Sequence, residues 1–197
     1  MTQVYRDDKV IPVTLIESGP NFVTQIKTKE KDGYTAVKLG FGIKKEKNIK
    51  KPQRGHLKNL SLLAGRQGNL RWLREFRADS TESKPSDEIK ISDFSPGDKV
   101  KVIAISKGKG FQGVVKRHGF HGGPKSHGQK DRHRAPGSIG SSFPEHVIKG
   151  MKMAGRMGGD RVTVKNLEIV EIDNENNLMA IKGAIPGRRG TLVLIKC

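Results

Sequence analysis

The sequence predicts a mainly β fold with a small, partly helical insertion and a long, irregular, basic extension. Short runs of alternating apolar and polar residues, bounded by Gly, Pro, Asn and Asp, recur before residue 43, near residue 100 and after residue 160. Such runs are typical of the strands of a barrel or sandwich. Between them, residues 117–160 hold ten Gly, three Pro and only five Leu, Ile, Val or Phe, too few apolar side chains for the segment to order itself by burial. We therefore expect an external partner to order it.

The first two strands are predicted to form a hairpin. Residues 10–16 form an apolar run, a turn follows at residues 17–21, and Phe22, Thr24 and Ile26 then alternate with polar neighbours. A shift in the alternation after residue 160 predicts a bulge near Asn166. The other expected strands lie at 34–41, 100–104, 162–172, 178–181 and 192–195.

One helix is predicted within an insertion at residues 44–84. Its apolar side recurs at helical spacing and Gly65 follows as a candidate C-cap. The residues on that side are His56, Leu57, Leu60, Leu63 and Ala64. Trp72 in the same insertion is either an anchor that packs the insertion onto the body, which we favour, or a stacking platform for a base.

The charge of the chain predicts an acidic polymer as its partner. There are 38 Lys and Arg against 20 Asp and Glu, a net charge of +18 in 197 residues, as is common in nucleic-acid-binding proteins. No apolar run approaches the roughly 20 residues of a membrane span, and the first residues lack the apolar stretch of a secretory signal. The single cysteine, Cys197, excludes an internal disulfide and a cysteine zinc site. We expect a cytoplasmic protein that uses no membrane, cofactor or small-molecule substrate.

A basic, glycine-rich loop at residues 106–113, Ser-Lys-Gly-Lys-Gly-Phe-Gln-Gly, joins two expected strands. Glycines let backbone amides approach phosphate and lysines supply charge. The loop lacks the spacing of a nucleotide-binding P-loop, and no helical pattern follows it. We favour contact with a nucleic-acid backbone over an ordinary basic turn or a nucleotide site.

Five of the six histidines fall within residues 117–160. Imidazole is a common metal ligand, but no cysteine accompanies these rings, and basic residues lie among them. They fit better as donors to phosphate and 2′-hydroxyl groups or as platforms for unstacked bases. Carboxylates are scarce in this segment and its serines lack a nucleophile elbow, so the sequence predicts no enzyme. Met151, Met153 and Met157 stand among glycines and cations, which favours a projecting tip over a core role.

These motifs resemble those of a known family, the universal ribosomal large-subunit protein three, in its bacterial or organellar form. The resemblance covers nearly the whole chain. It is carried by Phe94, residues 106–113, Arg117, the Arg-Ala-Pro-Gly-Ser-Ile-Gly of 134–140, residues 150–161 with Lys-Met-Ala-Gly at 152–155, Met-Thr-Gln at 1–3 and Lys-Gly-Ala-Ile-Pro-Gly at 182–187.

The resemblance implies a six-stranded Greek-key barrel like that of translation factors. The barrel body would comprise residues 1–43, 85–116 and 161–197, the inserted subdomain residues 44–84, and the extension into rRNA residues 117–160. It further implies a structural, non-enzymatic constituent of the large ribosomal subunit. Such a protein would bind near the 3′ end of the large-subunit rRNA, nucleate assembly and extend an arm towards the peptidyl transferase centre. Large-subunit proteins fourteen and nineteen would be its neighbours, in the cytoplasmic ribosome or in an organellar one.

Sixteen positions are carried over as rRNA-binding. They are Lys107, Lys109, Lys116, Arg117, His118, His121, Lys125, His127, Lys130, Arg132, His133, Arg134, Lys149, Lys152, Met153 and Arg156. Arg156 departs from the family, because many bacterial members carry a methylated glutamine at the tip, and we expect a more cationic contact here. Two other readings stay open: a free-standing RNA-binding module, and a metal hydrolase using His118, His121 and His133.

Overall fold

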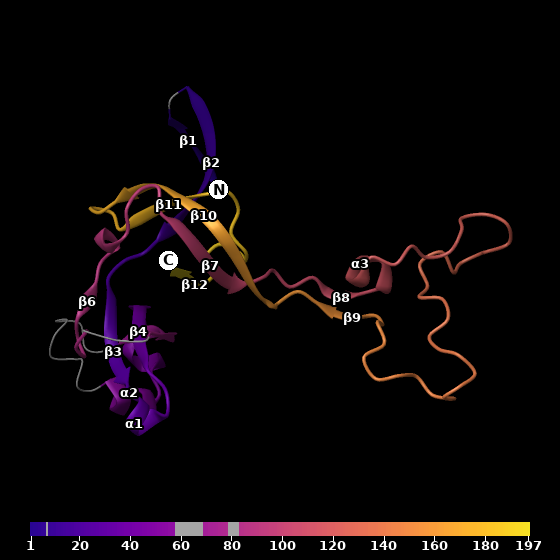
Figure 1. The fold of residues 1–197 in the computed structure, drawn as a ribbon, viewed down its shortest axis with the longest axis horizontal. Helices are drawn as coiled ribbons and strands as arrows, with labels where there is room; N and C mark the ends of the chain where they lie inside the picture. Colours follow the sequence, from indigo (N-terminus) through magenta and orange to yellow (C-terminus); the bar gives the residue numbers. More distant parts are fainter. Residues whose placement is uncertain (7, 58–68, 79–82) are drawn as a thin grey trace. The chain divides into compact units, whose positions relative to one another are not determined.

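The computed structural model describes residues 1–6, 8–57, 69–78 and 83–197. The chain divides into two compact units. The first unit comprises Met1–Val102, Val164–Ile185 and Ile195–Cys197, and the second unit comprises Ile103–Thr163 and Pro186–Leu194. Strands dominate the described elements, as the sequence predicts, and Figure 1 shows them along the chain.

A six-stranded sheet is the largest element of the fold. Its strand order is β1-β2-β11-β10-β7-β12, with β1 and β12 at its edges. The strands are β1 (Thr2–Arg6), β2 (Lys9–Glu17), β11 (Leu178–Lys182), β10 (Arg161–Asp173), β7 (Lys99–Ile105) and β12 (Val193–Lys196). Because strands from both ends of the chain lie side by side in this order, its pairing depends on contacts between distant segments.

The core of this sheet follows the alternation of its strands. Val100 and Val102 on β7 are 1% and 0% exposed, as their predicted common face requires. Val13, Val170 and Ala180 form a buried cluster from β2, β10 and β11. The predicted irregularity at Asn166 is confirmed, because this residue has a left-handed φ of 60° within β10. Residues 174–177 form the predicted turn into β11.

The predicted hairpin of residues 10–16 with residues 22–26 is wrong. Both segments are strands, but β2 pairs with β1 and β11, whereas β3 (Asn21–Lys27) pairs with β4 and β6 in another sheet. The segment between them is thus a crossing from one sheet to the other. Local alternation identifies a strand, but long-range side-chain packing selects its partner.

The second sheet has four strands in the order β5-β4-β3-β6. Its other members are β4 (Ala36–Ile43), β5 (Leu70–Arg77) and β6 (Glu88–Ile89). The predicted strand at residues 34–41 is confirmed as β4. The sequence analysis missed β5, which lies within residues 44–84 and pairs with β4 antiparallel, Val37 facing Phe76 and Phe41 facing Trp72. The domain boundaries expected from the resemblance stay a prediction.

Short helices connect these strands. They are α1 (Lys29–Asp32), α2 (Lys51–Leu57) and the 3-10 turns Glu46–Asn48 and Ile91–Asp93. The predicted helix is represented by His56 and Leu57 at the end of α2, and its positions 60, 63, 64 and 65 lie outside the described residues. Leu57 is buried together with Leu70 of β5. Among the described residues, no helix combines the length and apolar character that crossing a membrane requires.

The second unit contains little regular structure. It holds the two-stranded ribbon of β8 (Gly110–Gln112) and β9 (Gly155–Met157), and the helix α3 (Val114–His118). Between α3 and β9 the chain forms a long loop without helix or strand (Figure 1). We call residues 119–154 the arm. All residues of this unit are among those described.

Candidate nucleic-acid interface

Positive charge is concentrated in the second unit. Its 70 residues carry 14 Lys and Arg against three Asp and Glu, so this unit holds +11 of the net +18. No Lys or Arg of this fully described unit forms an ion pair, whereas the ion pairs seen elsewhere in the described chain lie in the first unit. Exposed charge that no carboxylate neutralises raises the local concentration of an anionic partner.

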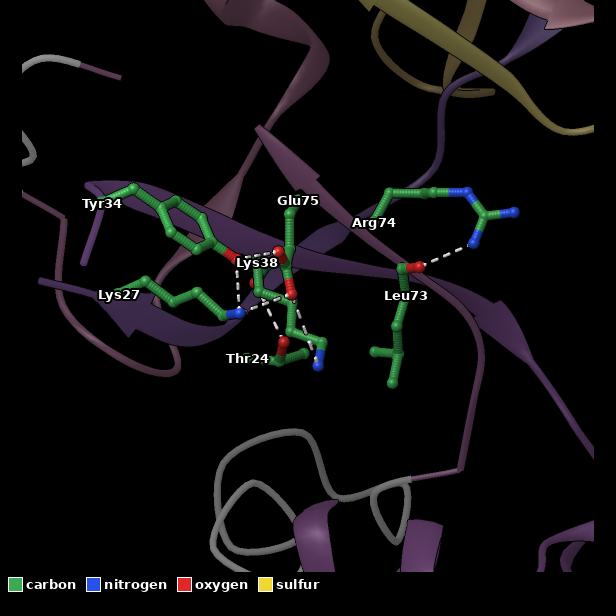
Figure 2. A network of polar contacts seen from close by, with 7 residues as sticks. All are labelled: Thr24, Lys27, Tyr34, Lys38, Leu73, Arg74 and Glu75. Carbon is green, nitrogen blue, oxygen red and sulfur yellow. Dashed lines mark hydrogen bonds and ion pairs between the residues drawn. The ribbon is translucent and has the colours of Figure 1, made fainter. Parts of the chain in front are cut away.

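The first unit shows the contrasting arrangement, in which cations meet carboxylates (Figure 2). Lys27 Nζ donates to the Tyr34 hydroxyl at 2.6 Å, and that hydroxyl donates to Glu75 Oε2 at 2.8 Å. Lys27 and Lys38 also lie 3.2 and 3.9 Å from Glu75 Oε1. The Tyr34 hydroxyl, followed by Lys27, lowers the pKa of Glu75, and the bonds to Tyr34 and Glu75 raise the pKa of Lys27. These cations are therefore already neutralised.

The basic, glycine-rich loop forms one side of an ordered ribbon. Gly110, Phe111 and Gln112 face Met157, Arg156 and Gly155 in antiparallel register. The Lys109 amide donates to the Met157 carbonyl at 2.9 Å and the Ser106 amide to the Asp160 carbonyl at 2.9 Å. The Asp160 amide returns a bond to Ser106 Oγ at 3.2 Å. Lys107 and Lys109 are exposed on this fixed backbone.

A helix does follow the loop, contrary to the sequence expectation. α3 has five residues, begins after Gly113 and ends at Gly119, which has a φ of 75°. A helix this short shows no 3.6-residue periodicity that sequence inspection could detect. Its last turn carries Lys116, Arg117 and His118.

Two side chains of α3 hold the far end of the arm. Arg117 Nη1 donates to the Met153 carbonyl at 2.8 Å, and His118 Nε2 lies 3.0 Å from the same carbonyl, as a donor. A charged guanidinium strengthens such a bond. We call this contact the base clamp, because it joins the two ends of the arm where they meet α3 and β9.

The arm is shaped by backbone contacts. His133 Nδ1 lies 2.9 Å from the Pro124 carbonyl, and the Gly123 amide donates to the His133 carbonyl at 2.9 Å. His127 and Lys130 have left-handed φ values of 59° and 46°. These contacts close a turn at residues 123–133 without an apolar core.

Most predicted site residues are exposed. The exposed ones are Lys107, Lys109, Lys116, His121, Lys125, His127, Lys130, Arg132, Arg134, Lys149, Lys152, Met153 and Arg156, and the half-buried ones are Arg117, His118 and His133. The structure brings Arg117, His118 and Met153 together in the base clamp and pairs Arg156 with the glycine-rich loop. Their binding to RNA stays a prediction.

The histidines named for a metal hydrolase are engaged elsewhere. His118 and His133 contact different backbone carbonyls. Within the described ranges, no three His, Cys, Asp or Glu side chains converge as metal ligands. The arrangement supplies hydrogen-bond donors along a cationic loop, which is what contact with a phosphate backbone requires.

Exposed apolar side chains are the feature that sequence reasoning missed. Phe111 on β8 is 77% exposed and Phe143 in the arm is 82% exposed. Met151 and Met153 are each 38% exposed, in agreement with a projecting tip rather than a core role. The alternation of β8 with β9 is the signal that would have placed Phe111 on a surface, but the ribbon is too short to recognise without its partner.

Comparison with known proteins supplies the family. The sequence model described as Ribosomal protein L3 matches residues 73–184. The chain is 52% identical to the large ribosomal subunit protein uL3 of Pelotomaculum thermopropionicum, over all of this chain and 91% of that protein. It is 52% identical to the uL3 of Herpetosiphon aurantiacus, over 99% of this chain and 91% of that protein. The uL3 of Chlorobium limicola is 48% identical, over 99% and 93% of the two chains. On these matches, which span the glycine-rich loop, the arm and both sheets, the chain belongs to the ribosomal protein L3 family.

Proposed function

We propose that this protein is a structural constituent of the large ribosomal subunit and binds large-subunit rRNA through its second unit. The observation that carries the proposal is the concentration of +11 of net charge on 70 residues in which no cation is paired with a carboxylate. Membership of the ribosomal protein L3 family supports the ribosome as its place of work. Its role is that of a scaffold in the cytoplasmic ribosome and not that of a catalyst.

Binding proceeds by exchange of counterions for cationic side chains. Each phosphate that a Lys or Arg neutralises releases a condensed cation, so affinity falls steeply as salt rises. The ribbon of β8 and β9 is held by backbone bonds before contact. The arm lacks an apolar core and is fixed by contact with the RNA, at a cost in conformational entropy. The sixteen predicted positions are the ones that we expect to make these contacts.

Finer features of this role rest on the resemblance stated above. The protein would bind near the 3′ end of the rRNA early in assembly, with its arm directed towards the peptidyl transferase centre. Its neighbours would be large-subunit proteins fourteen and nineteen. Within the chain, a Greek-key barrel of residues 1–43, 85–116 and 161–197 would anchor the protein, residues 44–84 would form the inserted subdomain, and residues 117–160 would reach into the RNA.

The test is chemical footprinting of the full chain on large-subunit rRNA with excess transfer RNA as competitor. The triple variant Lys149→Glu, Lys152→Glu, Arg156→Glu is compared with a control of equal charge change in the first unit, Lys29→Glu, Lys31→Glu, Lys47→Glu. All six side chains are exposed, so both variants should fold. We expect the first variant to lose protection at a discrete rRNA site and the control to keep it.

The salt dependence gives a second readout. Removing three phosphate contacts should reduce the slope of log affinity against log salt by about 2 to 3. Diffuse protection that the competitor abolishes would instead favour the free-standing RNA-binding module. Equal losses in both variants would refute the assignment of binding to the second unit.

A further inference from the structure

Phe111 is an exposed aromatic side chain on an ordered piece of backbone. It lies on β8 with 77% of its surface exposed. Several aromatic rings in the described chain carry a cation or another ring: Lys27 lies 4.9 Å from the Tyr34 ring, Arg71 4.9 Å from Trp72 and Lys196 5.1 Å from Phe76. Phe111 has no such partner among the described residues. Both faces of its ring are therefore free.

Arg156 faces Phe111 across the ribbon without covering it. The two residues are direct partners in the antiparallel register, which places their side chains on the same face. The Arg156 guanidinium is turned along its own strand, where Nη2 lies 3.4 Å from the position that a Cβ on Gly159 would occupy. The face of the ribbon thus presents an open ring beside an unpaired cation.

The backbone that carries Phe111 is fixed before any partner arrives. The Lys109 amide bonds the Met157 carbonyl at 2.9 Å, and the Gln112 side-chain amide bonds the Lys109 carbonyl. These contacts constrain the residues on both sides of Phe111. A contact made by its ring therefore loses little backbone freedom on binding, as preorganised contacts do.

The surroundings of the ring identify the partner. Lys107, Lys109 and Arg156 are exposed and form no ion pair, so an apolar pocket on a protein would have to desolvate them or supply several carboxylates. A nucleotide matches both features at once, because its base has an apolar face and its phosphate meets the cations. We infer that Phe111 is a stacking platform for an unpaired base of the RNA, with Arg156 and Lys109 on the adjoining phosphates. The inference rests on the proposed function, which it deepens by naming the kind of nucleotide bound at this ribbon.

Stacking separates the aromatic ring from the apolar volume, and the test uses that difference. Phe111→Leu removes the ring and keeps an apolar side chain, while Phe111→Tyr keeps the ring. Tyr5→Leu is the matched control, an aromatic that is 71% exposed on β1 in the first unit. Affinity is measured for the full chain on protein-free large-subunit rRNA and on transfer RNA, over a series of salt concentrations. Thermal unfolding of each variant checks its fold.

We expect Phe111→Leu to bind large-subunit rRNA about 5- to 150-fold more weakly, the range for loss of one stacked base. Phe111→Tyr and Tyr5→Leu should bind like the unsubstituted chain, and the salt slope should not change, because no phosphate contact is lost. In a chain with Phe111→Trp and Trp72→Phe, the single tryptophan should be quenched when RNA is added.

Other outcomes overturn the stacking. Binding of Phe111→Leu within twofold of the unsubstituted chain would do so, as would equal weakening by Phe111→Leu and Phe111→Tyr, or an unquenched tryptophan. The proposed function fails separately, if the unsubstituted chain binds large-subunit rRNA no better than transfer RNA. In that case the ratio of Phe111→Leu to Phe111→Tyr on either RNA still decides whether the ring stacks.

Discussion

Gly158 allows the backbone of the ribbon to approach the glycine-rich loop, and its replacement by alanine tests that geometry. The residue follows β9 and has a left-handed φ of 76°. A Cβ there would lie 2.2 Å from the Lys107 carbonyl oxygen and 3.0 Å from Gly108 Cα. Both obstacles are backbone atoms, so no side-chain rotation can relieve the contact.

The expected cost of Gly158→Ala has two parts. A left-handed conformation costs a residue with a Cβ about 1–2 kcal/mol. The contact of 2.2 Å is 1.2 Å short of the 3.4 Å at which ordinary contact begins, so the strands must separate there. Separation weakens the bonds of the Ser106 and Lys109 amides, each worth about 0.5–1.5 kcal/mol. Together we expect local destabilisation of about 2–5 kcal/mol.

Amide hydrogen exchange measures this locally, because it reports the free energy of opening for each amide. With tenfold per 1.4 kcal/mol, the Ser106 and Lys109 amides should exchange at least about 30-fold faster in Gly158→Ala. Gly159→Ala is the control, because its φ of 75° is nearly the same but its Cβ would meet only the end of the flexible Arg156 side chain at 3.4 Å. Equal acceleration in the two variants, or none in either, would refute the close-approach argument.

Three further predictions concern the first unit. Ile169 is fully buried, so Ile169→Ala should lower the free energy of unfolding by about 2–5 kcal/mol, measured as a lower urea midpoint with unchanged slope. Asn166→Val should destabilise the chain by about 1–2 kcal/mol in the same assay, because a β-branched residue tolerates the φ of 60° poorly, and an unchanged midpoint would contradict this. Because Tyr34 and then Lys27 lower the pKa of Glu75 in the folded state, its stabilisation is present above the pH where an exposed glutamate titrates, about 4.3, and is lost as the pH falls through the folded pKa. The difference in melting temperature between Glu75→Gln and the unsubstituted chain should therefore shrink between pH 7 and pH 3, and a constant difference would exclude the ion pairs as its source.

Strands were predictable from the sequence where their alternation is local and clean. Val100 and Val102 show this, since a period of two alone places them on one face. β5 was not predictable in the same way, because Arg71, Arg74 and Arg77 interrupt its apolar positions. Its place beside β4 is set by packing of Phe76 and Trp72 against distant strands. The wrong hairpin has the same origin, because a turn between two strands does not determine which sheet each of them joins.

The candidate site divides along similar lines. Its cations are visible as composition, because scarcity of carboxylates and of apolar residues needs no coordinates. The pairing of Phe111 with Arg156 and the convergence of Arg117 and His118 on Met153 join positions more than 30 residues apart. No local pattern encodes such distances. The chemistry of the partner could thus be predicted, but not the arrangement of the residues that meet it.

The base clamp determines how the arm can enter an RNA. His118 and the Met153 carbonyl are 35 positions apart in sequence yet in direct contact, so the intervening chain is a closed loop and not a tail. A tail can thread an aperture one strand wide, end first. A closed loop passes only where two chains fit abreast, and neighbouring strands are about 5 Å apart before their side chains are counted. An RNA that encircles the arm must therefore either offer a wide opening when the protein arrives or fold around it afterwards, which ties the order of folding of the two molecules to a single carbonyl.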